Sequence, residues 1–143
     1  MLYIRKRTTG AKGPSPGSLT VTATGTVSLE DDVAATGTAI LDFDAQAASV
    51  TADSMMGGTS TGDIRLGAVT LDDGVLLTLG GGAASAITTG AISGTAGGAA
   101  SNLTLNTTAN ATVGGIVGTD IGTVTITDSN NTWFTLALTA ATV

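Results

Sequence analysis

The residues best placed to do chemistry are two aspartates that share one face of a predicted strand. Asp42 and Asp44 are two positions apart in the alternating run Ala39–Ala45, so their carboxyl groups project from the same face about 7 Å apart. Carboxylates at that separation are compatible with acid and base catalysis on a glycoside. A glycosidase also needs a cleft with aromatic platforms, and aromatic residues are only 3% of this chain. We therefore interpret Asp42 and Asp44 as a solvated strand face.

Two residue types that carry much of enzyme chemistry are missing. The 143 residues include no His and no Cys. A single chain therefore lacks the commonest general base, a thiol nucleophile and the usual zinc ligands. The sequence predicts a non-enzymatic protein with no catalytic residue and no cofactor.

Two acidic clusters raise the question of calcium. Glu30, Asp31 and Asp32, and separately Asp72 and Asp73, supply carboxylate oxygens in predicted turns, where backbone carbonyls can complete the coordination of Ca²⁺. Neither cluster matches a calcium-loop pattern, and we favour turn-forming, solubilising acids as the explanation of both. The two interpretations stay open at this level, and our prediction names no metal ligand.

Positive charge is concentrated at the N-terminus. Four of the five basic residues lie within the first twelve positions: Arg5, Lys6, Arg7 and Lys12. All eleven acids lie from Glu30 onward. A basic segment can bind nucleic acid, but four charges without interleaved aromatics are few, and an acidic body repels a polyanion. We predict no nucleic-acid partner and favour an acidic surface of a neighbouring protein subunit.

Residues 1–18 are predicted to form an extended arm in front of a single all-β domain, residues 19–143. The arm contains both prolines, Pro14 and Pro16, which remove backbone donors and favour extended structure. Such a composition cannot bury enough apolar surface to fold alone, but it can lie across another surface. We expect the arm to be ordered only in an assembly, with Leu2, Tyr3 and Ile4 packing on a neighbour and the four basic residues pairing with its carboxylates.

The composition also predicts an assembly. Hydrophobic residues are 42% of the chain, yet aromatics are scarce and 21 residues are Gly, so large side chains for a core are in short supply. We expect further burial against identical copies, a shell protein, or both. The chain shows neither the apolar segment of a secretory signal nor a run of roughly 20 apolar residues that would span a membrane, so we predict no membrane partner.

The clearest element is Asp120–Thr139, which is predicted to be a β-hairpin. Residues 123–127 and 133–139 alternate apolar and polar side chains, as strands with one buried face do. Asp128 to Asn131 provide the polar side chains of a tight turn. Trp133 is expected to be an anchor, in the core or at an interface, because it buries a large apolar surface and donates one hydrogen bond.

The rest of the chain shows similar runs and no convincing helix. Asp72, Asp73 and Gly74 between two apolar runs predict a second hairpin over residues 64–79. Phe43 is the better core candidate of its run. Residues 51–62 are predicted to be a loop in which Met55 and Met56 cover a core edge. Residues 80–100 are read as a loop or a narrow strand pair.

Internal similarity suggests a second fold. NLTLN at Asn102 matches TVTIT at Thr123 with an offset of 21 residues, and LGAVTLDDG at Leu66 matches IGTVTITDS at Ile121 with an offset of 55. Over about residues 66–140 the chain resembles the Gly, Thr and Asn-rich coils of filamentous-haemagglutinin-type adhesins, which implies a β-solenoid. The offsets are not uniform. We therefore predict an antiparallel β-sandwich or jelly-roll-like fold, with a β-solenoid as the alternative.

The chain also resembles tailed-phage capsid decoration (cement) or fibre proteins. The resemblance lies in its size, in its richness in Ala, Gly and Thr, and in the terminal arm that precedes a β-domain. This resemblance implies a structural protein located in a virion. The repeat similarity implies the alternative, a module of a secreted bacterial adhesin or surface-layer protein at the cell surface.

Overall fold

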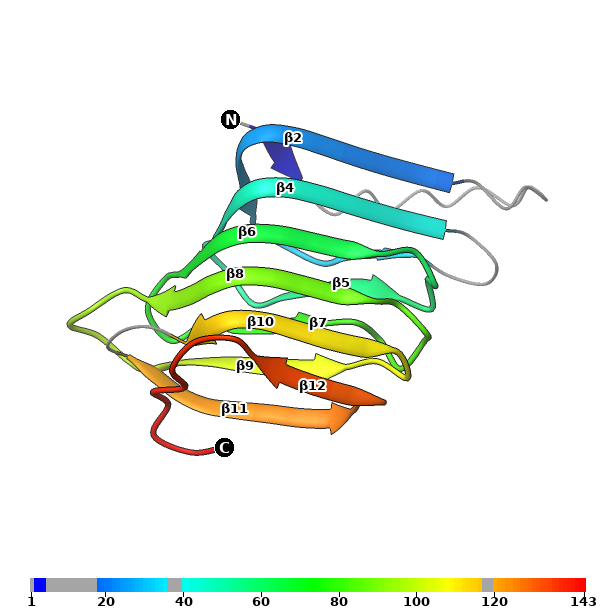
Figure 1. Cartoon of the computed structure of the whole chain (residues 1–143). Coiled ribbons are helices and arrows are strands. Elements are labelled where there is room, and N and C mark those ends of the chain that lie inside the picture. Colours follow the sequence, from blue (N-terminus) through cyan, green and yellow to red (C-terminus); the bar gives the residue numbers. More distant parts are fainter. Residues whose placement is uncertain (1, 5–17, 36–39, 117–119) are drawn as a thin grey trace.

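The computed structural model describes residues 2–4, 18–35, 40–116 and 120–143, and over these ranges it contains strands and connections but no helix (Figure 1). The prediction of an all-β chain is confirmed for them. The strands are β1 (Leu2–Ile4), β2 (Ser18–Leu29), β3 (Val33–Ala35), β4 (Ile40–Val50), β5 (Ser54–Gly58), β6 (Ile64–Leu71), β7 (Leu76–Leu79), β8 (Ile87–Gly94), β9 (Ser101–Asn106), β10 (Asn110–Ile116), β11 (Ile121–Asp128) and β12 (Asn131–Phe134).

The strands form a parallel β-solenoid. A seven-stranded sheet has the order β1-β2-β4-β6-β8-β10-β12, and a five-stranded sheet has the order β11-β9-β7-β5-β3. The chain passes alternately through the two sheets, so each of about five turns adds one strand to each sheet (Figure 1). All strand pairs in both sheets are parallel. The prediction of an antiparallel sandwich or jelly roll is wrong, and the alternative, a β-solenoid, is the observed fold.

Both predicted hairpins are corners between the sheets. β11 pairs with β9 and β12 pairs with β10, so the two strands of Asp120–Thr139 are not partners. β6 and β7 are likewise in different sheets. A strand alternates apolar and polar side chains whether its partner is the next strand or lies a full turn away. The alternation therefore located β6, β7 and β11 and left their pairing undetermined. The predicted strand over 133–139 is wrong beyond Phe134, because β12 is Asn131–Phe134.

The solenoid does not keep a uniform step. Ser101 pairs with Ile121, 20 residues on, whereas Leu76 pairs with Asn102, 26 residues on. The corners between strands absorb this difference because loops tolerate changes of length at small cost. Non-uniform offsets were our reason to prefer the sandwich, and that reason was mistaken.

The two repeat matches have different origins in the fold. The 21-residue offset is a true turn of the solenoid, since Leu103 and Leu105 of β9 pair with Val124 and Ile126 of β11. The 55-residue offset relates β6 to β11, which lie in different sheets. It reflects a shared strand pattern and not a stacking relation.

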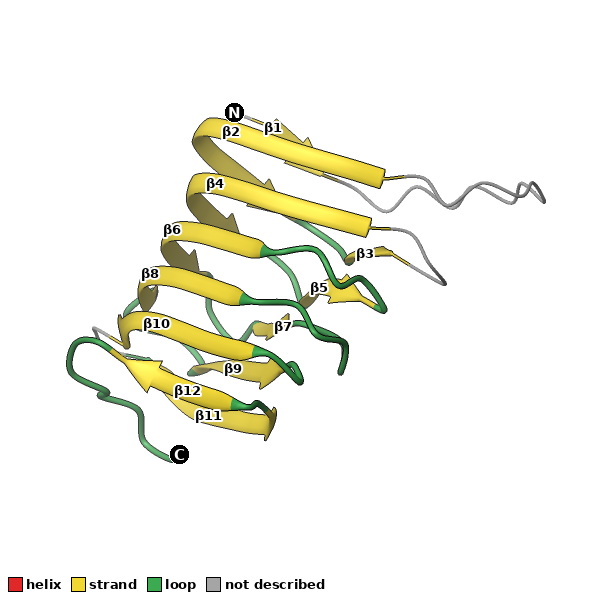
Figure 2. Ribbon diagram, turned by 45° about the vertical axis from the view of Figure 1, so that its right-hand side comes forward, coloured by secondary structure: helices red, strands yellow, loops and turns green. Residues whose placement is uncertain are grey.

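The long strands β2, β4, β6 and β8 of the larger sheet bend, so that each of these strands covers two faces of the solenoid (Figure 2). In β6 the alternation changes phase: Leu66 points inward, Gly67 and Ala68 both point outward, and Val69 points inward again. We call the part before the bend the front segment (43–45 in β4) and the part after it the side segment (47–50 in β4).

Glycine occupies the bend in three successive turns. A Cβ on Gly67 would collide with the carbonyl oxygen of Gln46, and a Cβ on Gly90 would lie 2.8 Å from the carbonyl carbon of Gly67. The same atom on Gly114 would lie 2.6 Å from the carbonyl carbon of Gly90. Backbones therefore approach more closely here than a side chain permits, which explains part of the glycine content.

The core is a set of inward columns with one residue per turn. Phe43, Ile64 and Ile87 follow one another in one column and are all buried, which confirms Phe43 as a core residue. Residues 51–62 are not all loop, because β5 places Met56 fully inside. Residues 80–100 likewise contain a full strand, β8, whose Ile92 is buried.

Candidate functional site

Outward-facing side chains of the front segments form a column that crosses the described body from β2 to β12. Its members, in order of the turns, are Thr22, Asp44, Arg65, Thr88, Thr112 and Trp133. The column is charged near the second and third turns and ends on an indole at the C-terminal edge. We call it the front column.

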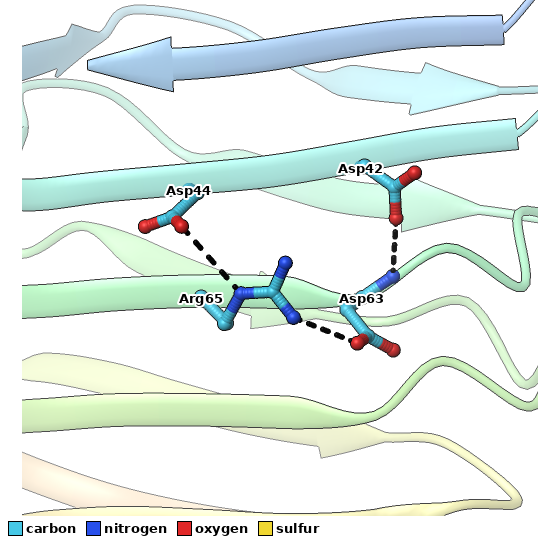
Figure 3. Close-up of polar contacts among 4 residues, drawn as sticks. All are labelled: Asp42, Asp44, Asp63 and Arg65. Atoms are coloured by element: carbon cyan, nitrogen blue, oxygen red, sulfur yellow. Dashed lines mark hydrogen bonds and ion pairs between the residues drawn. The ribbon is translucent and has the colours of Figure 1, made fainter.

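Arg65 forms ion pairs with one aspartate of its own turn and one of the preceding turn on this face (Figure 3). Its Nη1 lies 2.7 Å from Oδ2 of Asp63, and its Nε lies 3.6 Å from Oδ2 of Asp44. The backbone N–H of Asp63 donates a hydrogen bond of 3.0 Å to Oδ1 of Asp42 (Figure 3). Because the arginine and its partners are about half exposed, these ion pairs each stabilise the fold by about 0–1 kcal/mol.

The structure places Asp42 and Asp44 on one face of β4, as predicted, and gives both a structural role. Asp42 accepts a backbone hydrogen bond from the next turn, and Asp44 pairs with a guanidinium. Both interactions are local links between neighbouring turns. They support the interpretation of this pair as a strand face.

Two further carboxylates connect turns at the corner before the five-stranded sheet. Asp32 Oδ1 accepts the N–H of Met55 at 2.8 Å, and Asp53 Oδ1 accepts the N–H of Leu76 at 2.7 Å. They line a shallow groove of about 130 Å³ together with Ser54, Met55, Leu76 and Thr78. Each carboxylate stands in for a missing backbone acceptor where the ladder is interrupted.

The acidic clusters do not assemble into a metal centre in the described part of the chain. Asp31 uses Oδ1 to accept the N–H of Asp32, and Asp32 itself is engaged by the next turn. Asp72 and Asp73 are exposed at the corner between β6 and β7. No group of three or more His, Cys, Asp or Glu side chains is placed to hold an ion within those residues.

A buried ladder of hydroxyl groups marks the corner that leads into the front segments. Thr107 Oγ1 donates to the carbonyl of Ser85, and Ser85 Oγ donates to the carbonyl of Ser60. All three residues are buried. The sequence analysis missed them, although hydroxyl residues recurring 25 and 22 positions apart just before a strand were the available signal.

The C-terminal end of the solenoid is only partly covered. Residues 135–143 continue beyond β12, and residues 141 and 142 bond to the first half of β11: Ala141 N–H donates to Ile121, and Thr142 accepts from Val124. Phe134, Leu138 and Ala140 pack against the core. No further described strand covers the rest of this end.

Large apolar side chains gather at this open end. Of the five described large hydrophobic residues that are exposed, four lie beyond residue 120: Ile126 (41% exposed), Trp133 (49%), Leu136 (63%) and Val143 (69%). Ile126 ends an inward column whose preceding member, Leu105, is fully buried. It is exposed because no further turn covers it.

The residues predicted to bind a partner fall into three groups. Leu2, Tyr3 and Ile4 form β1, whose backbone pairs with Val27–Leu29 of the same chain. Arg5, Lys6, Arg7 and Lys12 lie outside the described residues. Trp133 is half exposed on the edge strand β12. It is therefore not a core residue, and only its predicted role as an interface anchor remains.

Comparison with protein-family models, with curated proteins and with solved structures found no match. Within the described ranges, no helix is long and apolar enough to cross a membrane. The case for a function therefore rests on the geometry of the solenoid and its ends.

Proposed function

We propose that this chain is a non-enzymatic structural protein that assembles into a larger particle, as a fibre segment of a virion. The observation that carries the proposal is the C-terminal end, where exposed apolar side chains border β12, an edge strand that pairs with β10 alone among the described strands. Edges of this kind are templates for pairing with another chain. A parallel solenoid also grows along one axis, which suits a rod more than a flat shell subunit.

The use of the polar side chains supports a structural role. The carboxylates of Asp32, Asp42 and Asp53 each accept a backbone N–H from the following turn. Buried hydroxyl groups at the corners also link neighbouring turns, because they donate hydrogen bonds to backbone carbonyls of the preceding turn. Each of these groups makes a hydrogen bond to the backbone of a neighbouring turn, so the contacts hold successive turns together.

A second candidate, a module of a secreted adhesin or surface-layer protein, is favoured by one observation. The similarity between residues 102–106 and 123–127, which carries the resemblance to filamentous-haemagglutinin-type coils, corresponds to a real turn of the solenoid. Such adhesins would use the same rod to extend a binding surface away from a cell.

Immunogold electron microscopy separates the two. Antibodies raised against residues 19–143 are applied to particles and to cells purified from the natural source. A fibre segment should be labelled along projections of a sedimenting particle, and an adhesin along the cell surface. Recovery of the chain only as a free, unassembled protein in the cell extract would contradict both.

A further inference from the structure

The shallow groove at the corner before the five-stranded sheet is built from three successive turns of the solenoid. Its lining residues come from the start of the β2–β3 corner, from β5 with the residue before it, and from β7. With a volume of about 130 Å³, the groove is smaller than the sites of roughly 300–1,000 Å³ that enclose small molecules. It can therefore receive a side chain of a partner but not a whole cofactor.

Part of the groove surface is apolar. Leu76 faces outward from β7 and is 38% exposed, whereas Leu77 and Leu79 of the same strand are fully buried. Met55 lines the groove from β5, next to the fully buried Met56. Among the described large hydrophobic residues that are exposed, Leu76 is the one that lies before residue 120. These two side chains offer an apolar surface over which an aliphatic chain can lie.

Two carboxylates from successive turns flank this apolar surface. The Oδ1 atoms of Asp32 and Asp53 accept the N–H groups of Met55 and Leu76, and these hydrogen bonds hold both side chains in place. Among the described residues, no donor forms a hydrogen bond with the Oδ2 atom of either aspartate. The described ranges contain one basic side chain, Arg65, which is paired with two aspartates of the front face. The groove therefore presents negative charge that the described part of the chain does not neutralise.

The lining favours an organic cation over a metal ion. Ca²⁺ takes about six to eight oxygen ligands, and the described residues place no group of three or more His, Cys, Asp or Glu side chains around an ion. The hydroxyl of Ser54, which also lines the groove, already donates to the carbonyl of Ala52. An arginine side chain fits better, because its guanidinium donates several hydrogen bonds to carboxylates while its methylene groups lie on apolar side chains.

We infer that this groove binds the basic segment, residues 5–12, of another copy of the chain. This inference names the partner contact of the proposed structural role and rests on that role. Residues 5–12 lie outside the described ranges; they carry four of the five basic residues of the chain and no acid. In an extended segment Arg5 and Arg7 project to the same side about 7 Å apart, and Lys6 projects to the other side. One segment can therefore present two guanidinium groups to the two carboxylates.

Binding of a labelled peptide tests the contact. The probe is a fluorescein-labelled peptide of residues 1–13. The host is the full chain carrying Arg5→Gln and Arg7→Gln, so that its own segment does not compete. Fluorescence anisotropy should show binding, and adding Asp32→Asn and Asp53→Asn to the host should weaken that binding by about tenfold or more, because hydrogen bonds to charged groups are lost. Asparagine keeps an Oδ1 acceptor for the backbone N–H of the next turn, so the fold is preserved.

Two matched controls remove the same amount of charge elsewhere. Asp42→Asn with Asp44→Asn takes two charges from the front face of the host. The affinity should then stay within about twofold in about 0.1 M salt, where charges more than about 10 Å apart are largely screened. A probe carrying Lys6→Gln and Lys12→Gln should bind more tightly than a probe in which both arginines are replaced by glutamine, although the two probes have equal charge. Circular dichroism checks that each host has kept its strands.

Sedimentation velocity tests whether the contact joins different copies. The natural chain should associate at concentrations at which the Arg5→Gln, Arg7→Gln chain and the Asp32→Asn, Asp53→Asn chain each stay monomeric. An equimolar mixture of these two variants should form a heterodimer, because one variant keeps the groove and the other keeps the basic segment. High salt should reverse both associations.

Other results overturn the inference. Absence of peptide binding at millimolar host concentration, or equal weakening by the front-face substitutions, would mean that the groove is not the binding site. A natural chain that stays monomeric although the host binds the peptide would mean that each chain fills its own groove. A mixture that stays monomeric would mean that the segment of a whole chain does not reach the groove of another. In each of these cases, labelling of a particle by the antibodies would keep the proposed function and assign assembly to a different contact.

Discussion

Replacing two neighbours in one inward column by alanine tests whether the turns stack as described. Leu105 of β9 and Ile126 of β11 are partners in register, yet Leu105 is fully buried and Ile126 is 41% exposed. Leu105→Ala opens a closed cavity between two turns, and such changes cost about 2–5 kcal/mol. Full burial of an aliphatic side chain contributes about 1.5–3 kcal/mol. Ile126 is 41% exposed, so three-fifths of that burial with no closed cavity gives a cost of about 1–2 kcal/mol for Ile126→Ala.

The assay is equilibrium unfolding in urea, followed by circular dichroism at low protein concentration so that association does not contribute. We expect the free energy of unfolding to fall by about 2 kcal/mol more for Leu105→Ala than for Ile126→Ala. If the first variant does not fold, the milder pair Leu105→Val and Ile126→Val should keep the same order. Equal losses for the two positions would refute the reasoning, because they would mean that Ile126 is as enclosed as its neighbour.

Three further outcomes are expected. Gly90→Ala should lower the free energy of unfolding by about 1–3 kcal/mol, because the added Cβ would collide with the backbone of Gly67. The control, Gly25→Ala, has open space around the added Cβ and should leave the melting temperature nearly unchanged. Arg65→Ala should lower the free energy of unfolding by less than about 1 kcal/mol, and this loss should disappear in 1 M salt. A larger loss would show that the front column does more than link neighbouring turns. The fluorescence of Trp133 should be quenched by acrylamide in dilute protein, and it should become protected and blue-shifted as the protein concentration rises. Emission that does not depend on concentration would argue against the predicted role of Trp133 as an interface anchor.

The predicted arm gives one more test. Deleting residues 2–12 removes β1, which contacts the body only through Val27–Leu29. The body should keep its strand spectrum and lose attachment to its assembly. Assembly as tight as that of the full chain would mean that the N-terminal segment plays no part in the contact.

The strands themselves were largely readable from the sequence. Alternating runs located β6, β7, β9 and β11, and the outward placement of Asp42 and Asp44 followed from the same two-residue period. β5 was missed because Gly57 and Gly58 follow two methionines, a composition more typical of loops. Only the structure shows that Met56 lies in an inward column and is fully buried.

The candidate site was harder to foresee than the strands. Trp133 was singled out for its size, yet its exposure depends on its lying on the outward face of β12, in the front column. The links made by Asp32, Asp53 and Ser85 join residues 23 to 25 positions apart. Such contacts can be predicted only once the solenoid step at each corner is known, and that step varies.

The sequence by itself determined that the chain is all β over the described residues, that its large side chains are few, and where strands such as β6, β7, β9 and β11 lie. These properties are local, because propensity and the two-residue alternation act within a few neighbouring residues. Which strands pair, in which direction, and which residues are left at the ends were decided only by the tertiary structure. The pattern of Asp120–Thr139 suits a hairpin as well as a corner. In the structure Val124 pairs with Leu103 of the turn before and both are buried, a contact between residues far apart in the sequence that the local pattern does not specify.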